Sequence, residues 1–339
     1  MIINKKFKHI NKTQCQTERV FKMKKYYPEN HLIGTAENKN ALSSKAAIKE
    51  AYYSGKILEV RATVCDKDHN LHVDLGVMKG IIPRNEGAIG IEDGSVRDIA
   101  IISRVNKPVV CKIIDFTTDE KGEICAVLSR KAVQLDCMRE YISKLVPGQV
   151  IEAVVTHMES FGVFADIGAG ISALMPIDSI SVSRIPHPSA RFSTGEKIKA
   201  VVKSIDENGR VTLSYKELLG TWEENAALFK PGETVPGIVR SVERYGIFVE
   251  LKPNLAGLAE YVPGVMPGQH ASVYIKNLIP ERMKIKLIIV DSFDAQYPNE
   301  PTEYYCNDSF IDRWVYSPDC CSKKVETVFC DYELTQNAI

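Results

Sequence analysis

Long apolar runs are absent from this sequence of 339 residues, and no stretch approaches the ~18 consecutive apolar residues that a membrane-spanning helix needs. The beginning of the chain also lacks the short apolar core of a secretory signal. The nine cysteines are odd in number and include no Cys-x-x-Cys pair. Because nothing indicates export, we expect reduced thiols and a cytoplasmic protein.

Motifs for catalysis and for metal binding are also missing. The sequence has no Gly-rich phosphate loop, no His-Glu-x-x-His motif and no paired-carboxylate pattern. His69 and His72 lie near Cys65, but no second ligand cluster has a suitable spacing, and the cysteines after residue 300 lack the spacing of a zinc finger. We therefore expect a protein that is not an enzyme, with no metal, no cofactor and no small-molecule substrate.

Charge is balanced overall but not along the chain. The formal net charge is zero, whereas residues 1–25 contain eight Lys or Arg against one acid, and residues 291–339 contain ten acids against three bases. A basic arm can add a salt-sensitive phosphate contact, but both ends can equally be solvated tails. The acidic tail contains aromatic residues around Trp314, which either fold back on the third repeat or dock a partner.

One segment of the sequence occurs twice. Pro147-Gly148 leads to Phe161-Gly162-Val163-Phe164, and Pro231-Gly232 leads to Tyr245-Gly246-Ile247-Phe248, with a constant offset of 84 residues. Such internal periodicity indicates that one supersecondary unit was copied. Each copy places two aromatic residues around a glycine on a predicted strand, an arrangement typical of stacking platforms for single-stranded nucleic acid.

Alternating strands and turn residues indicate the fold of the unit. In the second copy, strands at 198–205 and 210–215 flank Asn208-Gly209, a strong hairpin signal that requires positive φ at both positions. Five short strands in ~70 residues, with a long excursion at 178–194, fit a Greek-key barrel of the OB type. Residues 57–64, 72–76 and 80–83 follow the same order and form a more divergent first copy.

The predicted fold is mainly β, with three tandem five-stranded OB-type barrels joined by short helices. A helix is expected over 41–53, another between the first two copies, and a third that starts at the capping box of Thr221 and Glu224 and runs to about Phe229. The predicted organisation is a basic leader and short helix (1–54), repeat one (55–131), a helical connector (132–146), repeat two (147–217), a second helical connector (218–230), repeat three (231–290) and an acidic aromatic tail (291–339).

The pattern Phe161-Gly162-Val163-Phe164, Gly168, Leu174, Gly195-Glu196, Asp206 and Arg210-Val211-Thr212-Leu213-Ser214 resembles the RNA-binding repeat named after bacterial ribosomal protein S-one. Three such repeats resemble a short form of that protein. The resemblance covers about residues 55–290 and is weakest in repeat one. It implies OB barrels, single-stranded RNA as a partner, and association with the small ribosomal subunit.

The resemblance also implies RNA contacts from two aromatics on strand two, a His on strand three, and an Asp and an Arg near the last hairpin. The resulting RNA-binding candidates are Phe161, Phe164, Asp206, Arg210, Tyr245, Phe248 and Lys284. The strand-three His is replaced by Pro176 and Glu260. Repeat one has His69 and His72 in place of the aromatic pair and Cys125 in place of Arg210, so we expect it to bind RNA poorly and to act as a docking module.

Chemistry supports these candidates and leaves alternatives for each. Strict alternation would put Phe161 and Phe164 on opposite faces, whereas a bulge at Gly162, or at Gly246 in repeat three, would return both rings to one face. Otherwise one ring of each pair belongs to the core. Arg210 either contacts RNA or is a solvated strand end. Asp206 either accepts from a base amine or Arg210, or is a turn residue, and strand alternation alone explains an exposed Lys284.

The repeats are near neutral, since repeat two has seven Lys or Arg and eight acids, so stacking should outweigh phosphate attraction. We expect a non-enzymatic RNA-binding protein that holds mRNA near the small ribosomal subunit, with repeats two and three on RNA. Two alternatives are an interaction protein in RNA turnover or transcription and an RNA-binding regulator that never joins the ribosome. The missing strand-three His favours the first alternative.

Overall fold

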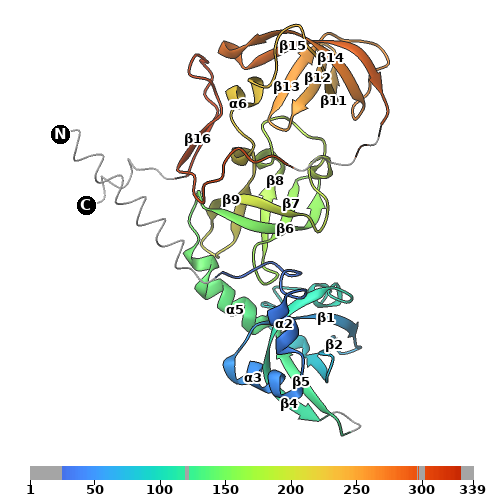
Figure 1. The fold of residues 1–339 in the computed structure, drawn as a ribbon, viewed down its shortest axis with the longest axis vertical. Coiled ribbons are helices and arrows are strands. Elements are labelled where there is room, and N and C mark those ends of the chain that lie inside the picture. The colour runs from blue at the N-terminus through green and yellow to red at the C-terminus, as the bar shows by residue number, and fades with distance from the viewer. Residues whose placement is uncertain (1–24, 119–121, 296, 298–301, 330–339) are drawn as a thin grey trace, which may run out of the picture. The chain divides into compact units, whose positions relative to one another are not determined.

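The computed structural model describes residues 25–118, 122–295, 297 and 302–329. Nearly all of the basic arm over 1–25 lies outside these residues. Three closed five-stranded barrels make up most of the described chain (Figure 1). The predicted mainly-β fold of three OB-type barrels with short helices between them is confirmed.

Each barrel uses five consecutive strands. Barrel one contains β1 (Leu58–Cys65), β2 (Leu71–Asp74), β3 (Lys79–Ile82), β4 (Pro108–Thr118) and β5 (Ile124–Ser129). Barrel two contains β6 (Val150–Glu159), β7 (Gly162–Asp166), β8 (Ser172–Pro176), β9 (Lys197–Ile205) and β10 (Val211–Ser214). Barrel three contains β11 (Thr234–Glu243), β12 (Gly246–Lys252), β13 (Leu255–Ala259), β14 (His270–Ile279) and β15 (Lys284–Phe293).

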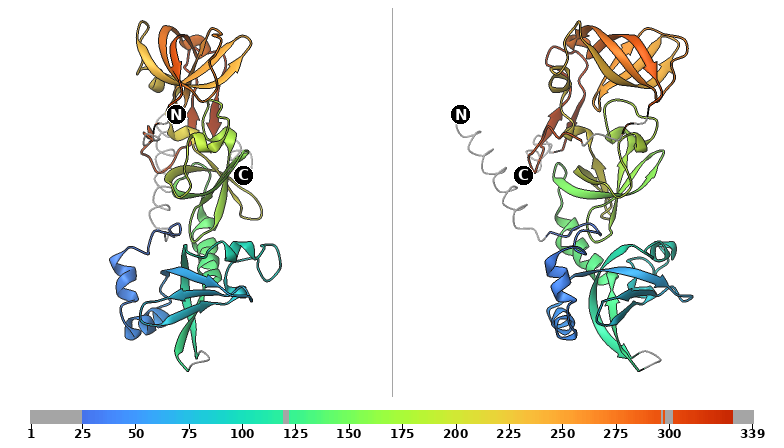
Figure 2. Two further views of the ribbon diagram at one scale, coloured as in Figure 1. Left: turned by 90° about the vertical axis from the view of Figure 1, so that its right-hand side faces the viewer. Right: turned by 45° about the vertical axis from the view of Figure 1, so that its right-hand side comes forward.

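The strand order is the same in the three barrels. The first three strands form a meander, the fifth pairs in parallel with the third, and the fourth pairs with both the fifth and the first. This Greek-key closure leaves no unpaired sheet edge. The views in Figure 2 show the strands curling around each barrel, with barrel three in orange.

Short helices precede and join the barrels. The described α-helices are α2 (Ala36–Ala41), α3 (Lys45–Ser54), α4 (Ile99–Ile102), α5 (Arg130–Glu140) and α6 (Trp222–Ala226). The described 3-10 helices are η1 (Arg84–Glu86), η2 (Ile142–Lys144), η3 (Ile177–Ser179), η4 (Pro188–Ala190), η5 (Lys216–Leu218) and η6 (Pro280–Arg282).

Capping residues set the helix boundaries. The helix expected over 41–53 is split, because the Ser44 hydroxyl accepts from the Ala47 N–H and starts α3, after α2 has ended at Ala41. The predicted capping box is confirmed, since the Thr221 hydroxyl and the Glu224 carboxylate each accept from the other residue's backbone N–H. That helix ends at Ala226 and is therefore shorter than expected.

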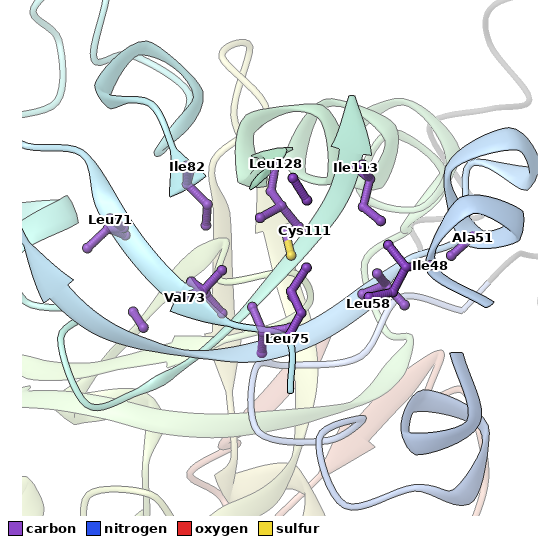
Figure 3. Close-up of a cluster of buried hydrophobic side chains, with 14 of the residues drawn as sticks. Ile48, Ala51, Leu58, Leu71, Val73, Leu75, Ile82, Cys111, Ile113 and Leu128 are labelled. Atoms are coloured by element: carbon purple, nitrogen blue, oxygen red, sulfur yellow. The ribbon is translucent and has the colours of Figure 1, made fainter. Parts of the chain in front are cut away.

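Alternation along the strands builds the core of barrel one. Leu58, Leu71, Leu75, Ile82 and Leu128 are almost fully buried and meet inside the barrel, while Ile48 of α3 packs against the same cluster (Figure 3). Burying apolar area is the main favourable term in folding. The first repeat, although divergent in sequence, therefore retains a complete core.

The β9–β10 hairpin has a turn different from the predicted one. Only Gly209 has positive φ, at 74°, and Asn208 does not. The Gly209 N–H donates to the Asp206 carbonyl, and the Asp206 carboxylate accepts from the N–H groups of Asn208 and Arg210. This is a type I turn followed by a left-handed glycine, which needs one positive φ instead of two.

The described chain forms two compact units. One contains the described residues up to Leu145, together with Glu152–Val154 and Asp166–Ser172, and the other contains the remaining described residues. In the second unit, Glu250 of β12 is paired with both Arg240 of β11 and Arg191, which precedes β9. The Asn254 amide donates to the carbonyls of Lys216 and Gly220. Barrels two and three are thus linked by buried polar contacts.

The acidic tail folds back within the second unit and contains the short strands β16 (Arg313–Val315) and β17 (Glu326–Val328). The backbone of Ile311 donates to Gly148 of barrel two, and Trp222 of α6 donates to the Tyr316 carbonyl. The Tyr316 hydroxyl reaches the carbonyl of Asn254 in barrel three. The tail therefore packs on barrel two and α6 and also touches barrel three. Of the two alternatives that the sequence left open, folding back and docking a partner, the structure shows folding back.

Candidate nucleic-acid interface

Two aromatic rings lie on the outside of barrel two. Phe161 is 54% exposed, and the Phe164 side chain is half-buried. Their ring centroids lie 6.0 Å apart with an interplanar angle of 88°, so each ring keeps a face that the other does not cover. Val163 and Ala165, which alternate with Phe164 along β7, are completely buried and fill the core in place of the rings.

Barrel three repeats this arrangement. Tyr245 is 71% exposed, Phe248 is half-buried, and their centroids lie 6.1 Å apart at 87°. Ile247 and Val249 take the interior positions of β12. In neither barrel, therefore, does one ring of the pair belong to the core. Both pairs are exposed and can stack on a base.

In barrel three a turn, and not a bulge at the glycine, puts the two rings on one face. Tyr245 lies in the β11–β12 turn, and β12 then pairs regularly with β11 through Gly246 and Phe248. The irregularity expected at Gly246 occurs instead on β11, between Val239 and Ser241. Phe161 likewise lies in the turn before β7. A turn residue is free of strand alternation, so its ring can join the ring on the strand.

The glycine between the two rings has a different role from the predicted one. A Cβ at Gly162 would lie 2.4 Å from the Met175 carbonyl oxygen, and a Cβ at Gly246 would lie 2.5 Å from that of Ala259. In both barrels, strand three approaches the backbone too closely for any side chain. Glycine at this position therefore allows the strand-three backbone to pack beside the aromatic turn.

Strand register shows which residues share a cross-strand row with the rings. In barrel three the paired residues are Ser241, Phe248, Leu258, Lys286 and Asn277, in order across β11, β12, β13, β15 and β14. The corresponding row of barrel two includes Leu174, Thr212 and Ser204 beside Phe164. These rows place a half-buried leucine next to each aromatic strand position.

Register also refines the cation candidates. Lys284 and Lys286 are both exposed on β15, but Lys286 is the one whose backbone pairs with Leu258, next to Phe248. Lys284 lies two residues away on the same face, at the position that Arg210 takes relative to Thr212 in barrel two. Lys286 is not among the residues predicted from the sequence, because strand alternation treats the two lysines alike and only the parallel β13–β15 pairing separates them.

Asp206 and Arg210 lie at the end of the last hairpin of barrel two. The Asp206 carboxylate accepts from two backbone N–H groups, so the turn role explains this residue without RNA. Arg210 is exposed and its backbone carbonyl accepts from the Asp206 N–H. Its guanidinium is therefore in a position to contact a phosphate or a base.

Barrel one has a different surface at the same place. Its corresponding row consists of Val64, His72, Ile81, Val127 and Asp115. The His72 Nε2 lies 3.0 Å from the Asp66 carboxylate, which anchors the imidazole. The pKa of Asp66 falls to about 2, because hydrogen bonds from Asn70 and His72 outweigh the effect of burial, which alone would raise it. Barrel one thus presents three aliphatic residues, a tethered His and an exposed Asp where the other barrels present rings.

Three further observations concern the described residues. No group of three or more His, Cys, Asp or Glu side chains in the described part of the chain is placed to hold a metal ion. The seven described cysteines are free thiols. None of the helices in the described ranges is long and apolar enough to cross a membrane.

Known proteins share this pattern. Residues 144–216 match the family model of the S1 RNA binding domain. The chain is 34% identical over 256 residues to a small ribosomal subunit protein bS1 homolog of Bacillus cereus, covering 74% of this chain and 62% of that protein. It is 29% identical over 275 residues to small ribosomal subunit protein bS1 of Staphylococcus aureus, covering 76% of this chain and 66% of that protein.

An enzyme and a solved structure also share similarity with this chain. It is 30% identical over 246 residues to a 4-hydroxy-3-methylbut-2-enyl diphosphate reductase of Fusobacterium nucleatum, covering 72% of this chain but only 28% of that enzyme. The crystal structure of a multidomain protein with nucleic acid binding domains from Streptococcus pneumoniae is 14% identical, with a TM-score of 0.23, and covers 72% of this chain and 76% of that one.

The closed barrels and the family match define a class, namely proteins of OB-type barrels that carry an S1 RNA-binding domain. Within this class the chain is similar to the bS1 proteins named above, and its three barrels are consistent with three S1 repeats. The chain spans 62% and 66% of the length of the two bS1 relatives named above.

Proposed function

We propose that this protein binds single-stranded RNA through the aromatic pairs of barrels two and three. The observation that carries the proposal is the repeated geometry of Phe161 with Phe164 and of Tyr245 with Phe248, at 6.0 Å and 6.1 Å with nearly perpendicular rings. Exposed rings with a free face stack on any base, which gives binding with little sequence preference.

Exposed cations supplement the stacking. Arg210 in barrel two and Lys284 and Lys286 in barrel three lie on the last strand of their barrels or just before it, and each is exposed. A few such contacts add a modest salt-dependent term to the affinity. Each platform alone binds weakly. Because the two platforms are linked in one chain, binding at one raises the effective concentration of the RNA at the other, and the combined affinity is higher.

A matched set of variants tests the proposal in the full-length chain. Phe161→Ala with Phe164→Ala and Tyr245→Ala with Phe248→Ala should each weaken binding to a fluorescent oligouridine by about thirtyfold or more, from ~1 kcal/mol per lost ring. Fluorescence anisotropy at fixed salt measures this. Tyr53→Ala removes an exposed ring of α3 and is the control. Unchanged affinity in the fourfold variant, with intact circular dichroism, would refute RNA stacking.

Ribosome association forms the second part of the proposal. The bS1 relatives are small ribosomal subunit proteins by name. Barrel one offers the exposed apolar residue Val64 in the row that carries the rings in the other barrels, and the exposed Ile124 at the start of β5. We propose that barrel one docks on the small subunit while barrels two and three hold mRNA, in the cytoplasm. The alternative is a protein-interaction or regulatory role in RNA turnover or transcription, favoured by Pro176 and Glu260, which stand where the resemblance implies a His.

Sucrose-gradient fractionation of a cell lysate separates these alternatives. The wild-type protein should sediment with small subunits, and the double variant Val64→Asp and Ile124→Asp should remain near the top of the gradient. The RNA affinity of that variant should stay unchanged. A wild-type protein found only in the light fractions would support the role away from the ribosome.

A further inference from the structure

A third ring adjoins the aromatic pair of barrel two. His157 of β6 lies against Phe164, with ring centroids 6.3 Å apart and an interplanar angle of 22°. Its side chain is 63% exposed. Since Phe164 also contacts Phe161, the three rings form a row on the barrel surface, with Phe164 in the middle.

Polar contacts fix this third ring in place. The His157 Nε2 lies 2.6 Å from Oε1 of Glu159, two residues further along the same strand. The hydroxyl of Thr156 donates to the Phe164 carbonyl at 3.0 Å, which ties β6 to β7 beside the rings. The imidazole is therefore held with its plane nearly parallel to the Phe164 ring while most of its surface remains open.

The other two barrels lack this ring. Register places Ser241 opposite Phe248 in barrel three and Val64 opposite His72 in barrel one. The Thr63 hydroxyl donates to the His72 carbonyl as Thr156 does to Phe164, so Val64 and His157 occupy equivalent positions. Barrel two alone among the described barrels has an aromatic side chain there.

We propose that His157 is a third base-stacking position, so that barrel two holds one nucleotide more of single-stranded RNA than barrel three does. The inference rests on the proposed RNA-binding function. Imidazole rings stack on unpaired bases as the rings of Phe and Tyr do. Glu159 is a positioning residue that limits rotation of the imidazole and thereby reduces the entropy lost on binding.

The test uses the full-length chain with Tyr245→Ala and Phe248→Ala, which confines binding to barrel two. In this background, His157→Ser introduces the residue of barrel three, and His157→Phe retains a ring. Oligouridines of increasing length, each with a fluorescent label, are titrated by anisotropy. We expect His157→Ser to weaken the binding of the longest probe about five- to tenfold and to shorten by one nucleotide the length at which affinity stops rising. His157→Phe should stay within about twofold of the parent.

One further double variant in this background makes the outcomes distinguishable. If His157→Ser leaves affinity and saturating length unchanged while Phe161→Ala with Phe164→Ala abolishes binding, the third position is refuted and the proposed function stands. If that pair also has no effect, the proposed function itself fails for barrel two. Equal losses in His157→Phe and His157→Ser, with intact circular dichroism, would also overturn the inference, because stacking would not be the cause.

Discussion

Glu250 should be essential for the stability of the unit that contains barrels two and three. Its carboxylate, 5% exposed, pairs with Arg191 and accepts from Arg240 at 2.9 and 3.0 Å. Burial lowers the pKa of Arg191 and the nearby Arg240 adds to this, whereas Glu250 opposes both effects. Glu250→Ala would leave two guanidinium groups buried side by side without an anion. Breaking a buried pair in this way costs about 3–5 kcal/mol.

The two tryptophans of the chain, Trp222 and Trp314, both lie in that unit, so their fluorescence reports its unfolding in urea. The control is Glu326→Ala, which breaks a largely exposed pair with Arg313 and should cost about 1 kcal/mol or less. Glu250→Gln retains the shape without the charge and should lie between the two. A loss for Glu250→Ala no larger than that of Glu326→Ala would refute the electrostatic reasoning.

Three other predictions follow from the same structure. A plot of log affinity for RNA against log salt should be shallow, on the order of two or three phosphate contacts, and deletion of residues 1–25 should flatten it if the basic arm touches RNA. Gly246→Ala should destabilise barrel three by about 1–3 kcal/mol in urea, since its Cβ would lie 2.5 Å from the Ala259 carbonyl oxygen. Burial and the nearby Glu29 raise the pKa of Asp166 to about 7, so the folded state binds a proton that the unfolded state has lost. Stability should therefore fall as pH rises from about 4 to about 7, and a pH series of urea melts in which Asp166→Asn does not flatten this dependence would contradict it.

Much of the fold could be predicted from the sequence because its signals are local. Alternating apolar residues define the strands, the constant offset between Phe161 and Tyr245 defines the repeats, and the capping box at Thr221 starts α6 where expected. The exposure of the ring pairs was also predictable, since the intervening Val163 and Ile247 suffice for the core. The bulge expected at Gly246 was wrong, because a turn residue and a strand residue share a face without a bulge at the glycine.

The remaining features depend on contacts between residues far apart in the sequence. Lys286 pairs with Leu258, the neighbour of Phe248, only because β15 pairs in parallel with β13, and the alternation of β15 cannot show this. His157 can be identified as a third ring only once the pairing of β6 with β7 is known, because that pairing brings it against Phe164. Docking of the tail through Ile311 and the buried Glu250 network likewise depend on how barrels two and three pack, and no local pattern encodes that.

Photo-cross-linking tests the central claim most directly. The full-length protein is irradiated with a single-stranded RNA that contains 4-thiouridine and is then digested with trypsin, and the cross-linked peptides are identified by mass spectrometry. The rings of barrel two fall within the tryptic peptide of residues 145–184, and those of barrel three within residues 245–276, because Pro253 blocks cleavage after Lys252. The account predicts cross-links at Phe161, Phe164, Tyr245 and Phe248, displaced by unlabelled single strand and not by duplex. Cross-links confined to barrel one or to the tail would contradict it.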